Sequence, residues 1–481
     1  ARCDSESHTY CFYFSDELLK EWKWSERYPS QKEIIKYLNF VTDRLDLRSN
    51  IRFKTRVLEL FYSDKKKSWL SVCEDGDKFR SQFVISAVGC LSATNYPSIP
   101  GRDNFKGEVY HTGSWPHRDI YFEGKNVGIL GTGSSGIQAI PIIAETATKL
   151  TVFQRTPNYS IPARNTALKE KFFDEFKQNI THFRSQMRAA RHGHPWLAPN
   201  ISVAGTPKSH RDNILNKAWD AGGLRFRESF GDTLTNLKSN ELMANFIRKK
   251  IRKIVKNKET AKILTNFDHP FGTKRPALDT NYYQTFNKEH VDLIDIRENP
   301  IQEITPSGIT TLMQQINLDM IIFATGFDAI TGSILRMNIC GKRGVSLAEC
   351  WKDGPQTYLG LQVFGFPNLF FITGPGSPSV LTNMPQSIDQ NVSWITSCLS
   401  YMKSKKFSTI EANKKAMDEW MEHVGDAAAK TLFLKADHSW YLGANVSEKP
   451  KVFMPYAGGL NSYRKICDKI AQNNYGGFSF A

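Results

Sequence analysis

The most constraining feature of this sequence is a glycine motif between an apolar strand and an amphipathic helix. Residues 126–130 read as a short strand, and residues 150–153 form a second apolar run. Between them, Ile137, Ile140 and Ile143 recur at helical spacing. The loop before that helix is Gly131, Thr132, Gly133, Ser134, Ser135 and Gly136. A G-x-G-x-x-G motif in such a βαβ unit predicts a Rossmann-type fold that binds a dinucleotide pyrophosphate, with a plain glycine turn as the alternative.

The end of the second strand indicates which dinucleotide binds. An acidic residue there would bind a ribose 2′-hydroxyl, whereas a cation accommodates a 2′-phosphate. Residues 153–157 contain no acid, but they contain Arg155 and Thr156. Arginine can pair with a phosphate through two hydrogen bonds, and threonine adds a hydroxyl donor. We therefore predict NADPH and not NADH, with an ordinary surface arginine as the alternative.

Other segments give a coarse secondary structure. Residues 16–46 are predicted to be helical, 56–60 and 69–72 to form a hairpin, and 83–89 to form a buried parallel strand. Residues 165–265 have a mostly helical pattern, and residues 318–324 form another apolar strand. A late helix near Pro385 is predicted to bury Ile388, Val392, Ile395, Leu399 and Met402.

Composition excludes several function classes. The formal net charge is +15, but the densest basic run, residues 248–258, fits the solvated face of a helix that buries Met243, Ile247, Ile251 and Ile254. We therefore expect no nucleic-acid partner. No run of 18 apolar residues is present, so no membrane span is expected. The eight cysteines lack C-x-x-C spacing, which argues against a zinc site or a dithiol enzyme and favours the cytoplasm.

A second motif lies just before the glycine loop. Phe105, Gly107, His111, Trp115 and Pro116 have the spacing F-x-G-x-x-x-H-x-x-x-W-P. This fingerprint resembles that of the type I Baeyer–Villiger monooxygenases, the class B flavoproteins of the phenylacetone and cyclohexanone monooxygenase type. The Trp-Pro ending favours this branch over the N-hydroxylating and flavin-containing monooxygenases. Further segments resemble the family in the same order along the chain, namely residues 1–4, 271–275, 324–326, 374–378 and 439–441.

The resemblance implies an α/β flavoprotein with two dinucleotide-binding domains, Rossmann-type FAD and NADP domains, and a helical insertion. Residues 1–92 would be the first part of the FAD domain. Residues 93–327 would be the NADP domain, with the helical insertion at about 161–276, and residues 328–481 would complete the FAD domain. The family's first glycine motif, which binds FAD, would precede Ala1, so the resemblance leads us to expect an N-terminally truncated chain.

The resemblance also implies the chemistry and the site. NADPH would reduce FAD, and O2 would form a flavin C4a-peroxide that converts a ketone to an ester or lactone. Arg275 would stabilise the peroxide anion and Asp4 would hold Arg275. Lys274 would bind the 2′-phosphate, Trp440 would contact the NADP ribose or the substrate, and His111 would act in a hinge. The ketone pocket would be lined by Ser379, Val380, Leu381 and Met384.

Two other functions stay open from the sequence. An N- or S-oxygenating flavin monooxygenase would share the same flavin chemistry. A non-catalytic NADP(H) sensor would not need both Asp4 and Arg275. The sequence leaves the physiological ketone and the oligomeric state undetermined.

Overall fold

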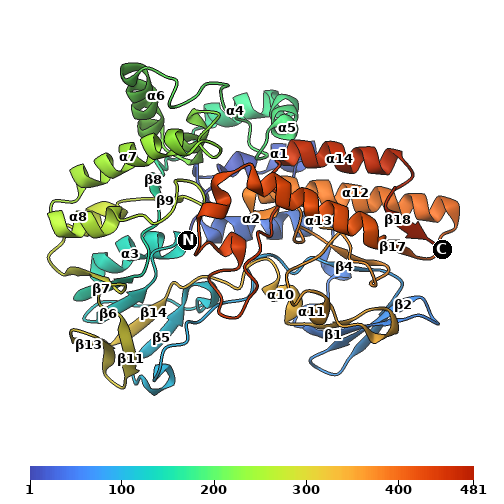
Figure 1. Cartoon of the computed structure of the whole chain (residues 1–481), viewed down its shortest axis with the longest axis horizontal. Coiled ribbons are helices and arrows are strands. Elements are labelled where there is room, and N and C mark those ends of the chain that lie inside the picture. Colours follow the sequence, from blue (N-terminus) through green and yellow to red (C-terminus); the bar gives the residue numbers. More distant parts are fainter.

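The structure is a computed structural model that describes all residues, 1–481. In Figure 1 the chain forms two lobes side by side, with the amino terminus between them and the carboxyl terminus at the outer end of one lobe. The chain crosses between the lobes more than once, so the residues beside the junction come from distant parts of the sequence.

The first lobe is built on a five-stranded parallel sheet in the order β10-β7-β6-β14-β5. Its strands are β5 (Glu108–His111), β6 (Asn126–Leu130), β7 (Lys149–Gln154), β10 (Val291–Asp295) and β14 (Met320–Phe323). Helix α3 (Ser134–Thr146) connects β6 to β7, which confirms the βαβ unit predicted from the sequence.

The two faces of this sheet are covered by different elements. Ile129 and Val152 pack with the buried isoleucines of α3, whereas the adjacent Leu130 and Phe153 pack against a β-meander. Successive strand residues point to opposite faces, so this alternation places α3 and the meander on opposite sides. The meander consists of β11 (Ile301–Thr305), β12 (Gly308–Thr311) and β13 (Gln315–Asn317).

A helical segment is inserted into this lobe. It lies between β8 (Ser160–Pro162) and β9 (Ala277–Asp279), which pair in parallel. Its helices are α4 (Glu170–Gln178), α5 (Ile180–Ala189), α6 (Lys208–Ala221), α7 (Leu237–Ile254) and α8 (Lys258–Thr265), and the short α9 (Tyr282–Thr285) follows β9. Helix α7 buries Met243, Ile247 and Ile251 as its spacing predicts, and its basic residues lie on the other face.

The second lobe combines both ends of the chain. A mixed sheet has the order β15-β1-β2-β3, from β1 (Val57–Ser63), β2 (Ser68–Cys73), β3 (Lys78–Ser81) and β15 (Asn338–Cys340). A two-stranded parallel sheet joins β4 (Val84–Ser86) to β16 (Leu369–Phe371). The other elements are α10 (Gly332–Leu335), α11 (Leu347–Cys350), α12 (Met384–Lys405), α13 (Lys414–Ala429), α14 (Leu460–Gln472), β17 (Ile410–Ala412) and β18 (Phe478–Phe480).

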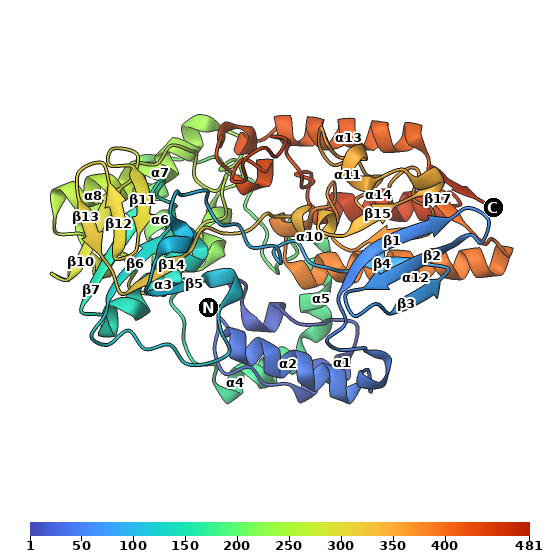
Figure 2. The same ribbon diagram turned by 90° about the horizontal axis from the view of Figure 1, so that it is seen from below.

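Two short N-terminal helices join the lobes. Helices α1 (Asp16–Glu21) and α2 (Gln31–Arg44) begin at Ser15 and Ser30, whose side chains accept hydrogen bonds from backbone N–H groups of the first turn. Figure 2 shows α1 and α2 beside α4 and α5 of the helical insertion. Tyr37 and Phe176, from these two parts of the chain, lie in one hydrophobic cluster.

Two local predictions are only partly right. Within residues 83–89, β4 pairs in parallel with β16 as predicted, but it is not buried, because it has a neighbour on one side only and Ile85 is 46% exposed. In α12, Ile395 and Met402 are buried as predicted, but Val392 is 46% exposed while Asn391 and Trp394 are buried. Asn391 accepts the N–H of Thr373 at 2.8 Å, and Trp394 donates to the carbonyl of Cys467 at 3.0 Å. These polar groups are buried because they have partners, so apolar periodicity alone located only part of the buried face.

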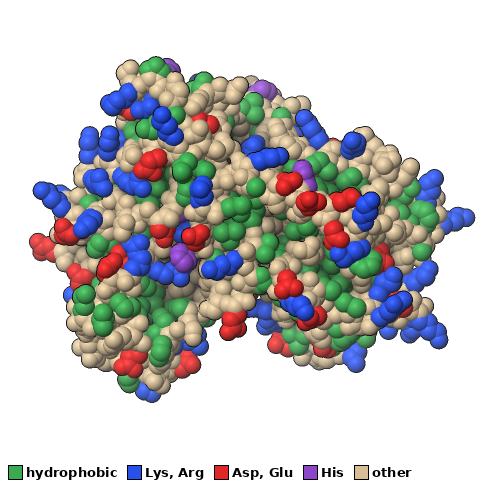
Figure 3. Space-filling view, in the orientation of Figure 1, with side chains coloured by type: hydrophobic (Ala, Val, Ile, Leu, Met, Phe, Trp, Pro, Cys, Tyr) green, Lys and Arg blue, Asp and Glu red, His purple; other side chains and the backbone are tan.

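Charge is spread over the surface. On the face seen in Figure 3, Lys and Arg side chains are interspersed with Asp and Glu and extend over both lobes. No helix of the structure is both long and apolar enough to cross a membrane.

Candidate active site

The glycine loop has the geometry of a phosphate cradle. It follows the carboxyl end of β6, and Gly131 has a φ of +105°, which a side chain would strain. A Cβ on Gly136 would lie 2.2 Å from the carbonyl oxygen of Gly131. Gly133 faces open space within 4 Å, and no side chain caps the first turn of α3. The free N–H groups of that turn therefore face an open position, which suits a pyrophosphate.

The residues expected to bind the 2′-phosphate lie around one carboxylate. Asp268 accepts a hydrogen bond from Thr156 Oγ1 at 3.3 Å and lies 3.8 Å from Lys274 Nζ. His269 Nδ1 lies 2.7 Å from Oδ1, the second carboxylate oxygen of Asp268. Burial lowers the pKa of Lys274, and the Asp268 carboxylate partly opposes that shift, while Arg155 is close enough to add to it. Thr156, Lys274 and Arg155 thus form one cationic corner beside the glycine loop.

Asp4 and Arg275 form a two-point ion pair, although 271 positions separate them in the sequence. Arg275 donates from Nε to Asp4 Oδ2 and from Nη2 to Asp4 Oδ1, the latter at 2.9 Å. The remaining Nη1 donates to the carbonyl of Val380 at 2.8 Å. The two side chains keep exposed fractions of 22% and 23%. The guanidinium is therefore fixed at three points and still has an accessible surface.

Both members of this pair stay charged. Burial alone would raise the pKa of Asp4, but the charge and hydrogen bonds of Arg275 outweigh it and hold this pKa below its ordinary value. Burial alone would lower the pKa of Arg275, and Asp4 reverses that shift. A permanently charged guanidinium is therefore available to an anion in this site.

The predicted pocket residues meet beside the pair. Val380 and Leu381 lie in the short helix η7 (Ser379–Leu381), and they share one apolar cluster with Met384 and Trp440. Ser379 has a φ of +40°, and its hydroxyl lies 3.4 Å from the sulfur of Cys90. The structure therefore gathers the four predicted pocket residues and Trp440 around the turn whose Val380 carbonyl Arg275 binds.

Of the fingerprint residues, His111 lies beside the link between the lobes, and the others lie within the first lobe. His111 Nε2 lies 3.3 Å from both the carbonyl of Asn95 and the hydroxyl of Thr325, in the segment that links β14 to the second lobe. Phe105 is buried, and a Cβ on Gly107 would lie 2.4 Å from the carbonyl of Asp319. Trp115 packs against Tyr110 and is partly exposed, and Pro116 follows it in the loop.

Sequence reasoning missed several residues of the site. Asp268 stands only six positions before Lys274, so an acid so near two basic residues was a usable signal. The half-buried His192 and the buried His194 gave no signal, because they lie in an irregular loop. Burial and the nearby charge of Arg275 lower the pKa of His194 to about 3. Burial likewise lowers the pKa of His192 to about 4.

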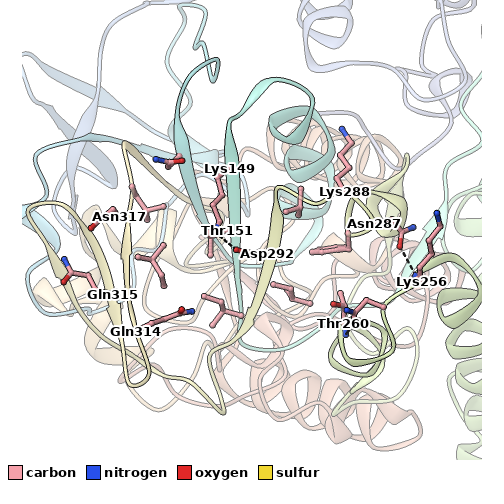
Figure 4. A pocket seen from close by; sticks show the side chains of 18 residues that line it. Lys149, Thr151, Lys256, Thr260, Asn287, Lys288, Asp292, Gln314, Gln315 and Asn317 are labelled. Carbon is pink, nitrogen blue, oxygen red and sulfur yellow. Dashed lines mark hydrogen bonds and ion pairs between the residues drawn. The ribbon is translucent and has the colours of Figure 1, made fainter.

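A large cavity lies elsewhere. A cavity of about 760 Å³ is lined by the first residues of β6, β7 and β10, among them Asn126, Lys149 and Val291. Figure 4 shows Lys149 and Asp292 side by side on neighbouring strands, and their charged groups lie 2.9 Å apart. Open parallel sheets bind nucleotides at the carboxyl ends of their strands. This cavity is at the opposite end from Gly131–Gly136 and is not the candidate active site.

Known proteins resemble this chain over its length. A family model described as pyridine nucleotide-disulphide oxidoreductase matches residues 10–193. All eight cysteines are free in the structure, so this match reflects nucleotide-binding architecture more than disulfide chemistry. The chain is 38% identical over 490 residues to 2-oxo-Δ3-4,5,5-trimethylcyclopentenylacetyl-CoA monooxygenase of Pseudomonas putida, covering 100% of this chain and 90% of that protein.

Two further comparisons agree. The chain is 38% identical over 481 residues to cyclohexanone 1,2-monooxygenase of Acinetobacter sp, covering 99% of this chain and 88% of that protein. A solved structure of the OTEMO enzyme in complex with FAD and NADP superposes with a TM-score of 0.96 at 38% identity, covering 100% of this chain and 91% of that one. The predicted α/β architecture with FAD and NADP domains is thereby confirmed, and the chain belongs to the Baeyer–Villiger family of flavin-dependent monooxygenases.

Proposed function

We propose that this protein is an FAD- and NADPH-dependent monooxygenase that inserts one oxygen atom of O2 beside a ketone carbonyl, giving an ester or lactone. The observation that carries the proposal is the three-point fixation of Arg275 by Asp4 and the Val380 carbonyl. A reaction that develops negative charge on oxygen needs a fixed cation, and this one lies beside an apolar pocket.

The cofactor and the protein side chains supply different parts of the reaction. Bound FAD, reduced by NADPH, supplies the oxygen-transfer chemistry. Arg275 supplies a cation that cannot lose its proton, and it orients the ketone oxygen and the oxygen anion through its accessible N–H groups. Asp4 is a positioning residue because it occupies two donors of Arg275. Val380, Leu381 and Met384 exclude water around the ketone, with Ser379 at the edge of the pocket.

The nucleotide sites fit these cofactors. The glycine loop, residues 131–136, would hold the pyrophosphate of NADPH. Arg155, Thr156 and Lys274 would bind its 2′-phosphate, and Trp440 would contact the ribose or the substrate. At the amino end of α12, Asn383 Oδ1 and Gln386 Nε2 are buried without a partner in the protein. A flavin ring beside them would supply the missing hydrogen bonds.

The domains follow from these sites. Residues 93–327 form the NADP-binding domain, with its helical insertion at about 161–276. Residues 1–92 and 328–481 form the FAD-binding domain. His111 lies in the hinge between the two, where it bridges Asn95 and Thr325. Eight free cysteines support a cytoplasmic location.

The test is a product assay. The protein is loaded with FAD and given NADPH, O2, cyclohexanone, an aryl ketone and a tertiary amine, and the products are identified by mass spectrometry. Formation of an ester or lactone that is lost in Arg275→Ala supports the proposal and the role of the arginine. Formation of the N-oxide alone, with both ketones untouched, would show that the protein is a heteroatom oxygenase instead.

A further inference from the structure

The turn that carries the proposed ketone pocket has every backbone carbonyl bound by a side chain. The carbonyl of Ser379 accepts from Thr382 Oγ1 at 2.8 Å, and that of Val380 accepts from Arg275 Nη1 at 2.8 Å. The carbonyl of Leu381 accepts from His192 Nδ1 at 3.0 Å. A carbonyl can only accept, so Nδ1 carries the proton in this contact.

This turn needs external support. Ser379 has a φ of +40°, and a left-handed conformation at a residue other than glycine costs about 1–2 kcal/mol. Such a conformation persists only where the surroundings impose it. The side chains of Val380 and Leu381 project from this turn into the apolar cluster, so a relaxed turn would move the pocket wall.

His192 is well placed to hold the turn in this conformation. The carbonyl of His192 accepts the N–H of Asn383 at 2.9 Å, and Asn383 Nδ2 donates to the carbonyl of Gly193 at 3.2 Å. The histidine backbone is thus anchored just after the turn, and its ring reaches back to Leu381. Only 14% of the side chain is exposed. The helical insertion therefore contacts the pocket wall through this ring as well as through Arg275.

The other side of the ring faces a charged pair. His192 Nε2 lies 3.6 Å from Glu228 Oε1, which is beyond hydrogen-bond length, and Glu228 accepts from Arg227 Nε at 3.0 Å. A cavity of about 80 Å³ borders these residues together with Leu381 and Thr382. The cavity leaves space beside the ring, so the bond to Leu381 is what fixes the ring against the turn.

We propose that His192 is a positioning residue for ketone binding, which fixes the η7 turn through its hydrogen bond to the carbonyl of Leu381. The inference rests on the proposed function, because it takes Val380 and Leu381 as the wall of the ketone pocket. It assigns to the helical insertion a direct part in shaping that pocket.

Three variants test the inference. His192→Ala removes the donor, whereas His192→Asn keeps an N–H donor at a similar distance from the backbone. His290→Ala is the matched control, since the ring of His290 makes a 3.0 Å contact with the carbonyl of Ala144 on α3, away from the η7 turn. Each variant is assayed for KM and kcat with cyclohexanone and for backbone hydrogen exchange in peptides covering residues 378–384.

For His192→Ala we expect the KM for cyclohexanone to rise about fivefold or more, as the loss of one hydrogen bond predicts, with a smaller change in kcat. Hydrogen exchange in residues 378–384 should rise by a similar factor. His192→Asn should restore both values to within about twofold, and His290→Ala should change neither.

The two readouts separate failure of this inference from failure of the proposed function. If the wild-type protein oxidises no ketone, the proposed function fails, and hydrogen exchange still decides whether His192 fixes the turn. Unchanged exchange and KM in His192→Ala would overturn the inference. It would also be overturned by His192→Asn behaving like alanine, or by the same changes appearing in His290→Ala.

Discussion

Replacing Arg275 by lysine keeps the positive charge and removes the paired hydrogen bonds to Asp4 that fix the side chain. Arginine donates three hydrogen bonds here, two to Asp4 and one to Val380. Lysine carries a compact ammonium group and can maintain one of them in the same place. The variant therefore loses two hydrogen bonds of a charged group. If each contributes about 1.5 kcal/mol, it loses about 3 kcal/mol of transition-state stabilisation.

A loss of about 3 kcal/mol in the transition state corresponds to a decrease in rate of about 150-fold. The assay measures ester formation by chromatography and NADPH oxidation by absorbance in the same reaction. We expect ester formation to fall by about two orders of magnitude in Arg275→Lys, while NADPH binding stays within about threefold of wild type.

The control is a surface arginine that makes the same paired hydrogen bonds to a carboxylate. Arg44 donates to Glu21 from Nε at 3.0 Å and from Nη2 at 3.1 Å, and it is far more exposed. Arg44→Lys should change neither rate, because exposed ion pairs contribute little. If Arg275→Lys kept ester formation within about threefold of wild type, charge alone would suffice and the argument from geometry would be refuted.

Three other predictions follow from the site. Lys274→Ala should raise the KM for NADPH about tenfold or more and leave the KM for NADH unchanged, because only NADPH has the 2′-phosphate. Equal effects on both KM values would contradict the assignment of Lys274 to the 2′-phosphate. Gly136→Ala should abolish NADPH binding in a calorimetric titration, since its Cβ would lie 2.2 Å from the Gly131 carbonyl oxygen, and retained affinity would refute the cradle. The third concerns His192 and His194, whose folded-state pKa values of about 4 and about 3 lie below the ordinary 6.5. The unfolded chain then binds more protons, so the free energy of unfolding should fall as pH drops from about 6.5 towards 4, by about 3 kcal/mol for a full shift of His192. Denaturant unfolding measures this slope, and His194→Gln should make it shallower; an identical slope would show that His194 does not contribute.

Much of the architecture was predictable because it depends on local sequence. The spacing of Ile137, Ile140 and Ile143 after the glycine loop requires a helix packed on a parallel strand, and α3 and β6 have the expected bounds. The prediction was only partly right in α12, where the buried polar side chains have partners such as Cys467 that are distant in the sequence.

The sequence by itself determined the nucleotide-binding unit and, through the resemblance, the residues proposed to act beside the flavin, because short motifs encode turns and phosphate contacts locally. Only the tertiary structure decided how those residues meet. Asp4 and Arg275 are 271 positions apart, and their fork exists because three parts of the chain converge at the junction of the lobes. The same convergence places Asp268 among the cations and His192 against Leu381. A hydrogen bond between distant segments depends on how whole elements pack, and spacing along the chain carries no record of that packing.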